Sequence, residues 1–270
     1  MKKSQKIFVL PMDNYANGEK LLDEFETIML EPDMGDLVAY IKLNDGVHNF
    51  DYGGPQILLT LEKLQRNLGI NFGIFLDLKI FDVSATLVNV MKKYLEIAPS
   101  ILTVSASCSI KGITDLRRLL PDTKLAIVNV LTDISNGECM DRFGMMPGNK
   151  IGRDLKIIEN LYSQKISSGD KPKPVDLIIC SALDIATIKK HVGSDYGFVT
   201  PGIRDAWMRN PNEHQKRTTG VSEALELGAD LIVSGAQLTK GCPENSISAA
   251  QSRQLTIEQI KNYYDKVGQN

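Results

Sequence analysis

The sequence contains little that could build a disulfide scaffold, a metal cluster or a membrane anchor. It has four cysteines, three histidines and one tryptophan in 270 residues. Cys108, Cys139, Cys180 and Cys242 show no CxxC spacing, and the histidines are scattered. We therefore interpret the cysteines as reduced and expect neither a metal site nor a disulfide framework. No apolar run approaches the roughly 20 residues of a membrane-spanning helix.

The chain also lacks an excess of one charge. Its formal net charge is −2, so no global basic field favours nucleic acid or an anionic membrane. The N-terminal stretch MKKSQKIFVLPMD begins like a signal peptide, but its apolar segment is short and Asp13 interrupts it. We expect a cytoplasmic protein that binds neither nucleic acid nor membrane.

Short apolar runs recur along the chain, and an amphipathic stretch follows each of them. Several are rich in Val and Ile, and their hydrophobicity is continuous, which is typical of parallel strands covered on both faces. The runs are IFVLPM, LVAYIKL, FGIFLDL, ILTVSAS, LAIVNVL, VDLIICS, YGFVT and DLIVSGA. Helices are expected over residues 19–30, 56–68, 84–97, 110–120, 152–167, 182–192, 219–227 and 256–267.

This alternation predicts an α/β fold, a single (β/α)₈ TIM barrel over residues 1–270. A doubly wound sheet is the alternative, but it rarely needs eight units in one domain. The longer connections, residues 44–55, 132–150 and 201–217, all follow predicted strands. Because barrel enzymes keep their sites at the carboxyl ends of the strands, we expect the functional site there.

Charged residues interrupt the third apolar run, in the segment GIFLDLKIFDV. Asp77 and Lys79 alternate along the strand and should point to the same side, at the mouth of the barrel. Lys42 lies near the end of the second run, and Asp82 follows the third. Each has an ordinary explanation: a buried ion pair for Asp77 and Lys79, a snorkelling lysine, and a helix N-cap for Asp82. Their convergence favours an array that keeps a lysine charged and ready to protonate a developing carbanion.

The segment FLDLKIFDVSAT resembles the Asp-x-Lys-x-x-Asp motif of the orotidine 5′-monophosphate decarboxylase family. The order of segments around it is similar over essentially the whole chain: PMDN, YIKLN, LTVSAS, LTDIS, and FVTPGIR followed by HQKR. The motif alone is shared with sugar-phosphate decarboxylases and hexulose-phosphate synthases. TPGIR with QKR favours the orotidylate branch.

The resemblance implies decarboxylation of orotidine 5′-monophosphate to UMP, the last step of de novo pyrimidine synthesis, without metal or organic cofactor. Lys42, Asp77, Lys79 and Asp82 would form the catalytic array. Lys79 would protonate C6, and Asp77 would sit against the substrate carboxylate. Asp82 and Thr86 would complete the site of a partner subunit, which implies a homodimer.

The resemblance also assigns the remaining substrate contacts. Asp13 and Lys42 would bind ribose hydroxyls. Ser135 would recognise the pyrimidine amide edge; the alternative is a simple turn residue in DISNGE. Phosphate would lie at the loops after the seventh and eighth strands, and the residues assigned to it are Pro201, Gly202, Ile203, Arg204, Gln215, Gly235 and Ala236. Arg204 and Arg209 could equally be ordinary surface charges.

One position departs from the family pattern. The eighth strand of the family ends in Gly-Arg, and that arginine holds the phosphate, whereas here Ala236 follows Gly235. A charge-assisted donor is therefore missing. The amides of Gly235 and Ala236 could still contact the anion, and Arg204, Gln237 or Lys240 could supply the lost contact.

Three alternatives stay open. A sugar-phosphate decarboxylase or aldolase would need a divalent metal, usually held by a glutamate one strand away from the motif, and the strand ends KLND and SASC contain none. A non-catalytic relative would bind a nucleotide without turnover. An enzyme with altered substrate specificity would depend less on the phosphate group of its substrate.

Overall fold

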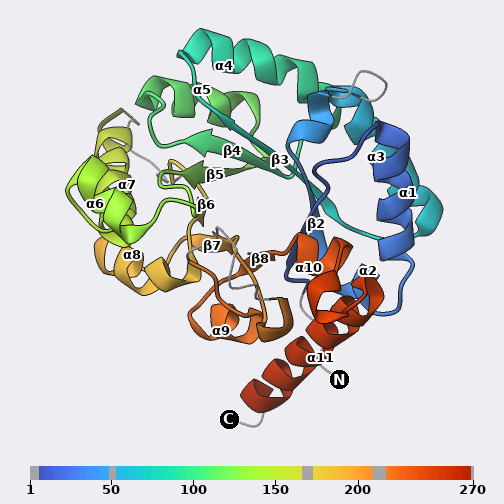
Figure 1. Cartoon of the computed structure of the whole chain (residues 1–270). Coiled ribbons are helices and arrows are strands. Elements are labelled where there is room, and N and C mark those ends of the chain that lie inside the picture. Colours follow the sequence, from blue (N-terminus) through green and yellow to red (C-terminus); the bar gives the residue numbers. More distant parts are fainter. Residues whose placement is uncertain (1–5, 49–52, 166–172, 209–216, 269–270) are drawn as a thin grey trace.

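Eight parallel strands close into a barrel in the order β1 to β8 (Figure 1). The computed structural model describes residues 6–48, 53–165, 173–208 and 217–268. The strands are β1 Phe8–Pro11, β2 Val38–Leu43, β3 Gly73–Ile80, β4 Ile101–Ser105, β5 Lys124–Val128, β6 Leu177–Ile179, β7 Gly197–Thr200 and β8 Leu231–Val233. The predicted (β/α)₈ barrel is confirmed, and each strand lies within or overlaps its predicted apolar run.

The strands are continuously hydrophobic in sequence because apolar layers cover them on both the inside and the outside of the barrel. Alternate side chains fill the barrel interior, including Val9, Phe75, Ile101 and Val199. The side chains between them face outward and pack against the helices. Both faces of each strand are therefore covered, as in other parallel sheets.

Helices surround the barrel (Figure 1). The long ones are α1 Gly18–Met29, α3 Pro55–Leu68, α4 Ser84–Met91, α5 Ile110–Leu119, α6 Asn136–Phe143, α7 Pro147–Lys165, α8 Ile185–Val192 and α11 Ala249–Gly268. The short ones are α2 Met34–Leu37, α9 Val221–Glu226 and α10 Ala236–Thr239, with 3₁₀ turns at Asp45–His48, Lys92–Ile97, Ala182–Asp184, Ala206–Met208 and Pro243–Asn245. Local signals set several ends: Ser109 accepts a hydrogen bond from the Gly112 N–H at the start of α5, and Gly228 follows α9 with a positive φ of 97°.

Some helices differ from their predicted bounds, and polar contacts explain the difference for α11. α11 begins at Ala249 rather than 256, and its first turns bury Ser252 and Arg253. Arg253 binds the Glu31 carboxylate and donates to the Leu238 carbonyl at 2.5 Å. α6, α2 and α10 were not predicted, and the connection 132–150 holds α6 and the start of α7. The helix expected over 84–97 changes to a 3₁₀ turn after Met91.

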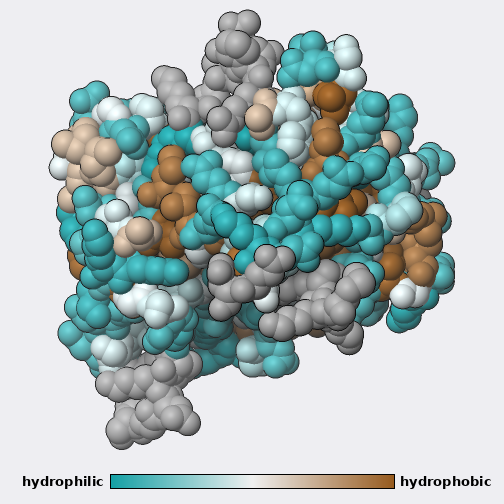
Figure 2. Space-filling view, turned by 90° about the horizontal axis from the view of Figure 1, so that it is seen from below, coloured by the Kyte–Doolittle hydropathy of each residue, from teal (hydrophilic) through white to brown (hydrophobic). Residues whose placement is uncertain are grey.

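The surface seen in Figure 2 is mostly hydrophilic, and apolar residues reach it in separate patches. In the described part of the chain, no helix is long and apolar enough to cross a membrane. The four cysteines are free and buried. The cytoplasmic location stays a prediction.

Candidate active site

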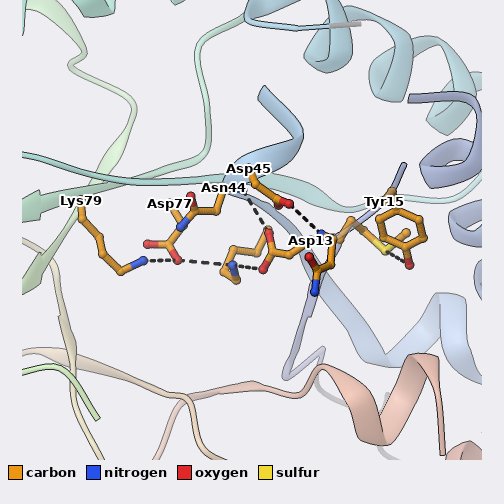
Figure 3. Close-up of polar contacts among 9 residues, drawn as sticks. Asp13, Tyr15, Asn44, Asp45, Asp77 and Lys79 are labelled. Carbon is orange, nitrogen blue, oxygen red and sulfur yellow. Dashed lines mark hydrogen bonds and ion pairs between the residues drawn. The ribbon is translucent and has the colours of Figure 1, made fainter. Parts of the chain in front are cut away.

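Charged side chains from three neighbouring strands meet at the mouth of the barrel (Figure 3). Lys79 Nζ lies 2.8 Å from Asp77 Oδ2 at the end of β3. Lys42 Nζ, from β2, lies 3.4 Å from the same oxygen and 2.7 Å from Asp13 Oδ2, which follows β1. The Asn44 N–H donates to Asp13 Oδ1 at 3.2 Å. The four groups therefore form one row of alternating charge.

Burial strengthens the attraction between Lys42 and Asp77 relative to a surface ion pair. The side chains of Lys42 and Asp77 are 10% and 9% exposed, so water screens them little. Burial also raises the pKa of Asp13 above its ordinary value, although the Lys42 ammonium opposes that shift. Asp77 Oδ1 is buried and accepts no hydrogen bond within the described residues. A buried carboxylate oxygen without a hydrogen bond is costly to keep, and it suggests a functional role.

The backbone of β3 is distorted where it carries the lysine. The pairing of β3 with β4 shifts register between Leu76 and Ile80, and Lys79 has a φ of +47°, which is rare for a residue with a side chain. Asp77 and Lys79 lie on the same side of β3, as predicted, and their charged groups are in contact. A bulge, rather than regular strand alternation, brings them together.

The charged row borders an apolar cavity of about 220 Å³. The cavity is lined by Lys42, Phe75, Asp77, Lys79, Val128, Val130, Leu131, Thr132, Ile179, Val199, Pro201 and Val233. Apolar walls with a few convergent polar groups are typical of small-molecule sites. Of the predicted phosphate-loop residues, Pro201 reaches this lining.

Asp82 lies apart from the row. It is exposed, and among the described residues of this chain it forms no ion pair. Its Oδ1 accepts the Val83 N–H at 2.6 Å, whereas α4 begins at Ser84 with Val83 at the N-cap position. Asp82 lines a broad, open groove with Phe81, Val83 and Ser84, and Thr86 is exposed on the same helix. Three of the four predicted catalytic residues therefore meet within one chain.

The predicted phosphate residues lie on two adjacent loops, because β7 and β8 are neighbours. Gly202 has a φ of +81°. Ile203 is buried, and Arg204 is half-buried with Nη1 donating to the Ile203 carbonyl at 2.9 Å. Gly235 is the N-cap residue of α10, and Ala236 is its first residue. Gln215 and Arg209 lie outside the described residues.

Two of the side chains suggested to replace the missing arginine, Gln237 and Lys240, are not positioned to contact the phosphate directly. The Gln237 side chain is fully buried, and its amide nitrogen donates to Asp205 Oδ2 at 2.6 Å and Thr256 Oγ1 at 2.9 Å. This amide is therefore not free to bind an anion directly. Lys240 is exposed just beyond the C-terminal end of α10, at the opposite end from Ala236.

Ser135 caps a helix. Its Oγ accepts the Glu138 N–H at 3.2 Å, at the N-terminus of α6. This agrees with the turn-residue alternative, and the pyrimidine contact stays a prediction. Thr132, three residues earlier, lines the cavity.

Sequence reasoning missed Thr103, which holds the bulge of β3. Its Oγ1 accepts the Lys79 N–H at 2.7 Å and lies 3.5 Å from the Leu76 carbonyl oxygen. A polar residue inside the apolar run ILTVSAS was the available signal. Among the described residues, no group of three or more His, Cys, Asp or Glu side chains is placed to hold a metal ion.

Sequence comparison identifies the family. The model of the "Orotidine 5'-phosphate decarboxylase / HUMPS family" matches residues 26–249. The chain belongs to this family. An orotidine 5′-phosphate decarboxylase from Wolbachia sp. subsp. Brugia malayi is 32% identical over 239 residues, which cover 87% of this chain and 93% of the relative. One from Nitrosospira multiformis is 29% identical over 76% of this chain and 81% of the relative. The prediction of a decarboxylase, a carboxy-lyase, is confirmed.

Solved structures agree on the fold. An orotidine 5′-phosphate decarboxylase from Lactobacillus acidophilus superposes with a TM-score of 0.64 at 23% identity, covering 96% of this chain and 99% of the other. The enzyme of that name from Pyrococcus horikoshii OT3 gives 0.62 at 16% identity, covering 94% and 99%. At these identities the likeness supports the barrel alone.

Proposed function

We propose that this decarboxylase converts orotidine 5′-monophosphate to UMP without a cofactor, as a step of pyrimidine synthesis. The observation that carries the proposal is the sharing of Asp77. Both lysines approach its Oδ2, at 2.8 and 3.4 Å, and its Oδ1 is left without a partner among the described residues. The carboxylate of Asp77 therefore holds the Lys42 and Lys79 ammonium groups close together at the mouth of the barrel.

The proposed chemistry breaks the bond between C6 and the carboxylate carbon. Carbon dioxide leaves, the electron pair stays on C6, and the Lys79 ammonium donates its proton there. Asp77 disfavours a second carboxylate beside it in the ground state, and the Lys79 ammonium stabilises the negative charge that develops on C6. The apolar walls formed by Val128, Ile179 and Val199 exclude water from this carbon.

The ribose and phosphate assignments extend the same proposal. Asp13, held by Lys42 at 2.7 Å, would bind ribose hydroxyls together with that lysine. Ser135 would contact the pyrimidine, and the phosphate would lie against the backbone of Pro201 to Arg204 and of Gly235 and Ala236. Gln215 is part of this assignment from the sequence. Binding of the remote phosphate would organise the charged row around the substrate.

We propose further that the active form is a homodimer. Asp82 lies away from its own charged row, and two large apolar side chains beside it, Phe81 and Val83, are 66% and 67% exposed. Exposed apolar side chains around a groove are typical of a protein interface. Asp82 and Thr86 would then enter the partner's site, where Asp82 would join Lys42, Asp77 and Lys79 as the fourth residue of the predicted catalytic array.

The test is an ultraviolet assay of orotidine 5′-monophosphate consumption, with UMP identified as product. Lys79→Ala should lower kcat by about 10³-fold or more, because it removes the general acid and the partner of Asp77. Lys92→Ala, which changes an exposed lysine of the following 3₁₀ turn, is the matched control and should be unaffected. An active Lys79→Ala protein would overturn the mechanism. Tight UMP binding without turnover would instead favour a non-catalytic relative.

A further inference from the structure

A buried side-chain amide connects the two loops assigned to the phosphate. Gln237, the second residue of α10, is fully buried. Its Nε2 donates to Asp205 Oδ2 at 2.6 Å and to Thr256 Oγ1 at 2.9 Å, and its Oε1 accepts the Asp205 backbone N–H at 3.0 Å. Both N–H groups and the carbonyl of this amide are therefore satisfied, as burial requires.

Asp205 is the other centre of this network. It is 2% exposed, and its Oδ1 accepts the Val221 N–H at 3.0 Å at the start of α9. A Cβ atom on Gly220 would lie 2.7 Å from this oxygen, so a glycine leaves room for the carboxylate. The network thus joins the β7 loop to α9, α10 and α11.

The same network fixes the backbone that leads into the proposed phosphate contact. Thr219 pairs with this segment: its N–H donates to the Gly202 carbonyl at 3.3 Å, and its carbonyl accepts the Arg204 N–H at 2.9 Å. Gln237 holds the next residue through the Asp205 N–H. The N–H groups of Gly202 and Ile203 take no part in the pairing with Thr219.

The second loop contributes backbone groups of its own. Ala236 immediately precedes Gln237 and follows Gly235, the N-cap residue of α10. The position of Gln237 therefore sets the position of the Gly235 and Ala236 amides relative to Gly202. Backbone N–H groups held in a fixed concave arrangement bind anions without a cation.

We propose that Gln237 is a positioning residue that compensates for the arginine missing at Ala236, by holding the two backbone segments in the geometry that binds the phosphate. This inference rests on the proposed function. In this inference, backbone N–H groups that are already in position bind the phosphate. The side-chain amide of Gln237 contributes to substrate specificity although it contacts no substrate atom. Preorganisation adds affinity because the loops need not be ordered on binding.

The experiment compares Gln237→Met, which keeps the length of the side chain and removes its hydrogen bonds, with Gln254→Leu, an exposed glutamine on α11. Each variant is assayed on orotidine 5′-monophosphate and on orotidine, which lacks the phosphate. Gln237→Met should raise KM for the phosphate ester about tenfold or more, with a smaller change in kcat and little change on orotidine. Gln254→Leu should match the unmodified protein. Equal losses on both substrates, or no loss on either, would overturn the inference.

Exchanging the amide and the carboxylate between positions 237 and 205 tests whether the lost phosphate selectivity can be restored. Gln237→Glu alone places two carboxylates in contact and should weaken phosphate selectivity. The pair Gln237→Glu with Asp205→Asn restores a donor and an acceptor across the 2.6 Å contact and should recover most of the selectivity. Failure of the pair to recover any of it, in a folded protein, would contradict the positioning role.

A readout independent of catalysis separates this inference from the proposed function. Hydrogen exchange of the backbone amides of Arg204 and Asp205 should be at least about tenfold faster in Gln237→Met than in the unmodified protein, with or without activity. If the unmodified protein consumes no orotidine 5′-monophosphate, the proposed function fails, and the exchange rates still decide whether Gln237 holds the loop. Unchanged exchange would overturn the positioning role itself.

Discussion

The backbone N–H of Lys79 donates a hydrogen bond of 2.7 Å to Oγ1 of Thr103 on the neighbouring strand. Lys79 has a positive φ of 47° at this point, a conformation that costs about 1 kcal/mol or more for a residue with a side chain. The fully buried hydroxyl of Thr103 therefore holds the strand in the shape that brings the Lys79 ammonium to Asp77.

Thr103→Val should lower decarboxylation about tenfold or more and destabilise the protein by about 1–3 kcal/mol, because the Lys79 N–H loses its acceptor inside the protein. Steady-state kinetics and urea unfolding measure the two effects. Thr123→Val is the matched control: Thr123 is also buried and donates to the Pro99 carbonyl at 2.7 Å, but it precedes β5, at the opposite end of the barrel. Full activity in Thr103→Val would show that the bulge is held without this bond.

Subunit exchange tests the role assigned to Asp82. Asp82→Asn and Lys79→Ala should each be nearly inactive alone. A mixture in equal amounts should recover about a quarter of the normal activity, since half of the dimers are mixed and each of these holds one intact site. The mixture is unfolded and refolded together, then assayed. A mixture as inactive as its components would place Asp82 in the site of its own chain.

Breaking the buried ion pair between Arg217 and Asp184 should lower the free energy of unfolding more than breaking a surface ion pair. Its two atoms, Arg217 Nη2 and Asp184 Oδ1, lie 2.6 Å apart, and both side chains are 8% exposed. Arg217→Leu or Asp184→Leu alone should lower the free energy of unfolding by about 3–5 kcal/mol, because each leaves one buried charge. The double substitution should cost far less than the sum. Arg217 Nε and Asp184 Oδ2 have no partner among the described residues, so part of the pair is already unsatisfied.

Arg142→Ala is the control for this cycle, because Arg142 and Glu138 form an exposed pair, 53% and 49% accessible. It should change the free energy of unfolding by about 0.5 kcal/mol or less. Additive losses at Arg217 and Asp184 would mean that the two side chains stabilise the protein independently.

Asp154 should make stability depend on pH. Burial acts to raise its pKa, but hydrogen bonds from Lys150, Asn129 and Arg153 outweigh burial and lower the pKa below the ordinary 3.8. The stabilising contribution of the carboxylate is thus complete above pH 3.8 and is lost as the pH falls through the lowered value. Asp154→Asn should be less stable by about 1 kcal/mol at pH 7, and the difference should shrink in acid.

Urea unfolding at neutral pH and at successively lower values measures this effect. Asp122→Asn, an exposed aspartate in the turn before β5, serves as the control and should show no such trend. A difference for Asp154→Asn that stays constant down to the most acidic measurement would contradict the assigned cause.

The sequence by itself determined the barrel, because its signals are local. Each of the eight apolar runs is continuous, so each is a strand covered on both faces, and the connections place their carboxyl ends together. The spacing of Asp77 and Lys79, with Lys42 one strand away, was sufficient to predict a charged site at the mouth. Hydrophobic periodicity could not reveal where α11 begins, since its first turns bury Arg253 and Ser252 through hydrogen bonds instead of apolar contacts.

Only the tertiary structure decided how these residues are held. The bulge at Lys79 depends on a hydroxyl of the next strand, 24 residues away. Gln237 meets Asp205 across 32 residues, and this contact exists because β7 and β8 lie side by side in the closed barrel. Hydrogen bonds of this kind depend on distances between separate elements, and a strand or helix pattern carries no information about such distances. Asp82 also shows the difference between sequence and tertiary structure. Its motif was evident in the sequence, but only the fold showed that it lies apart from the charged row.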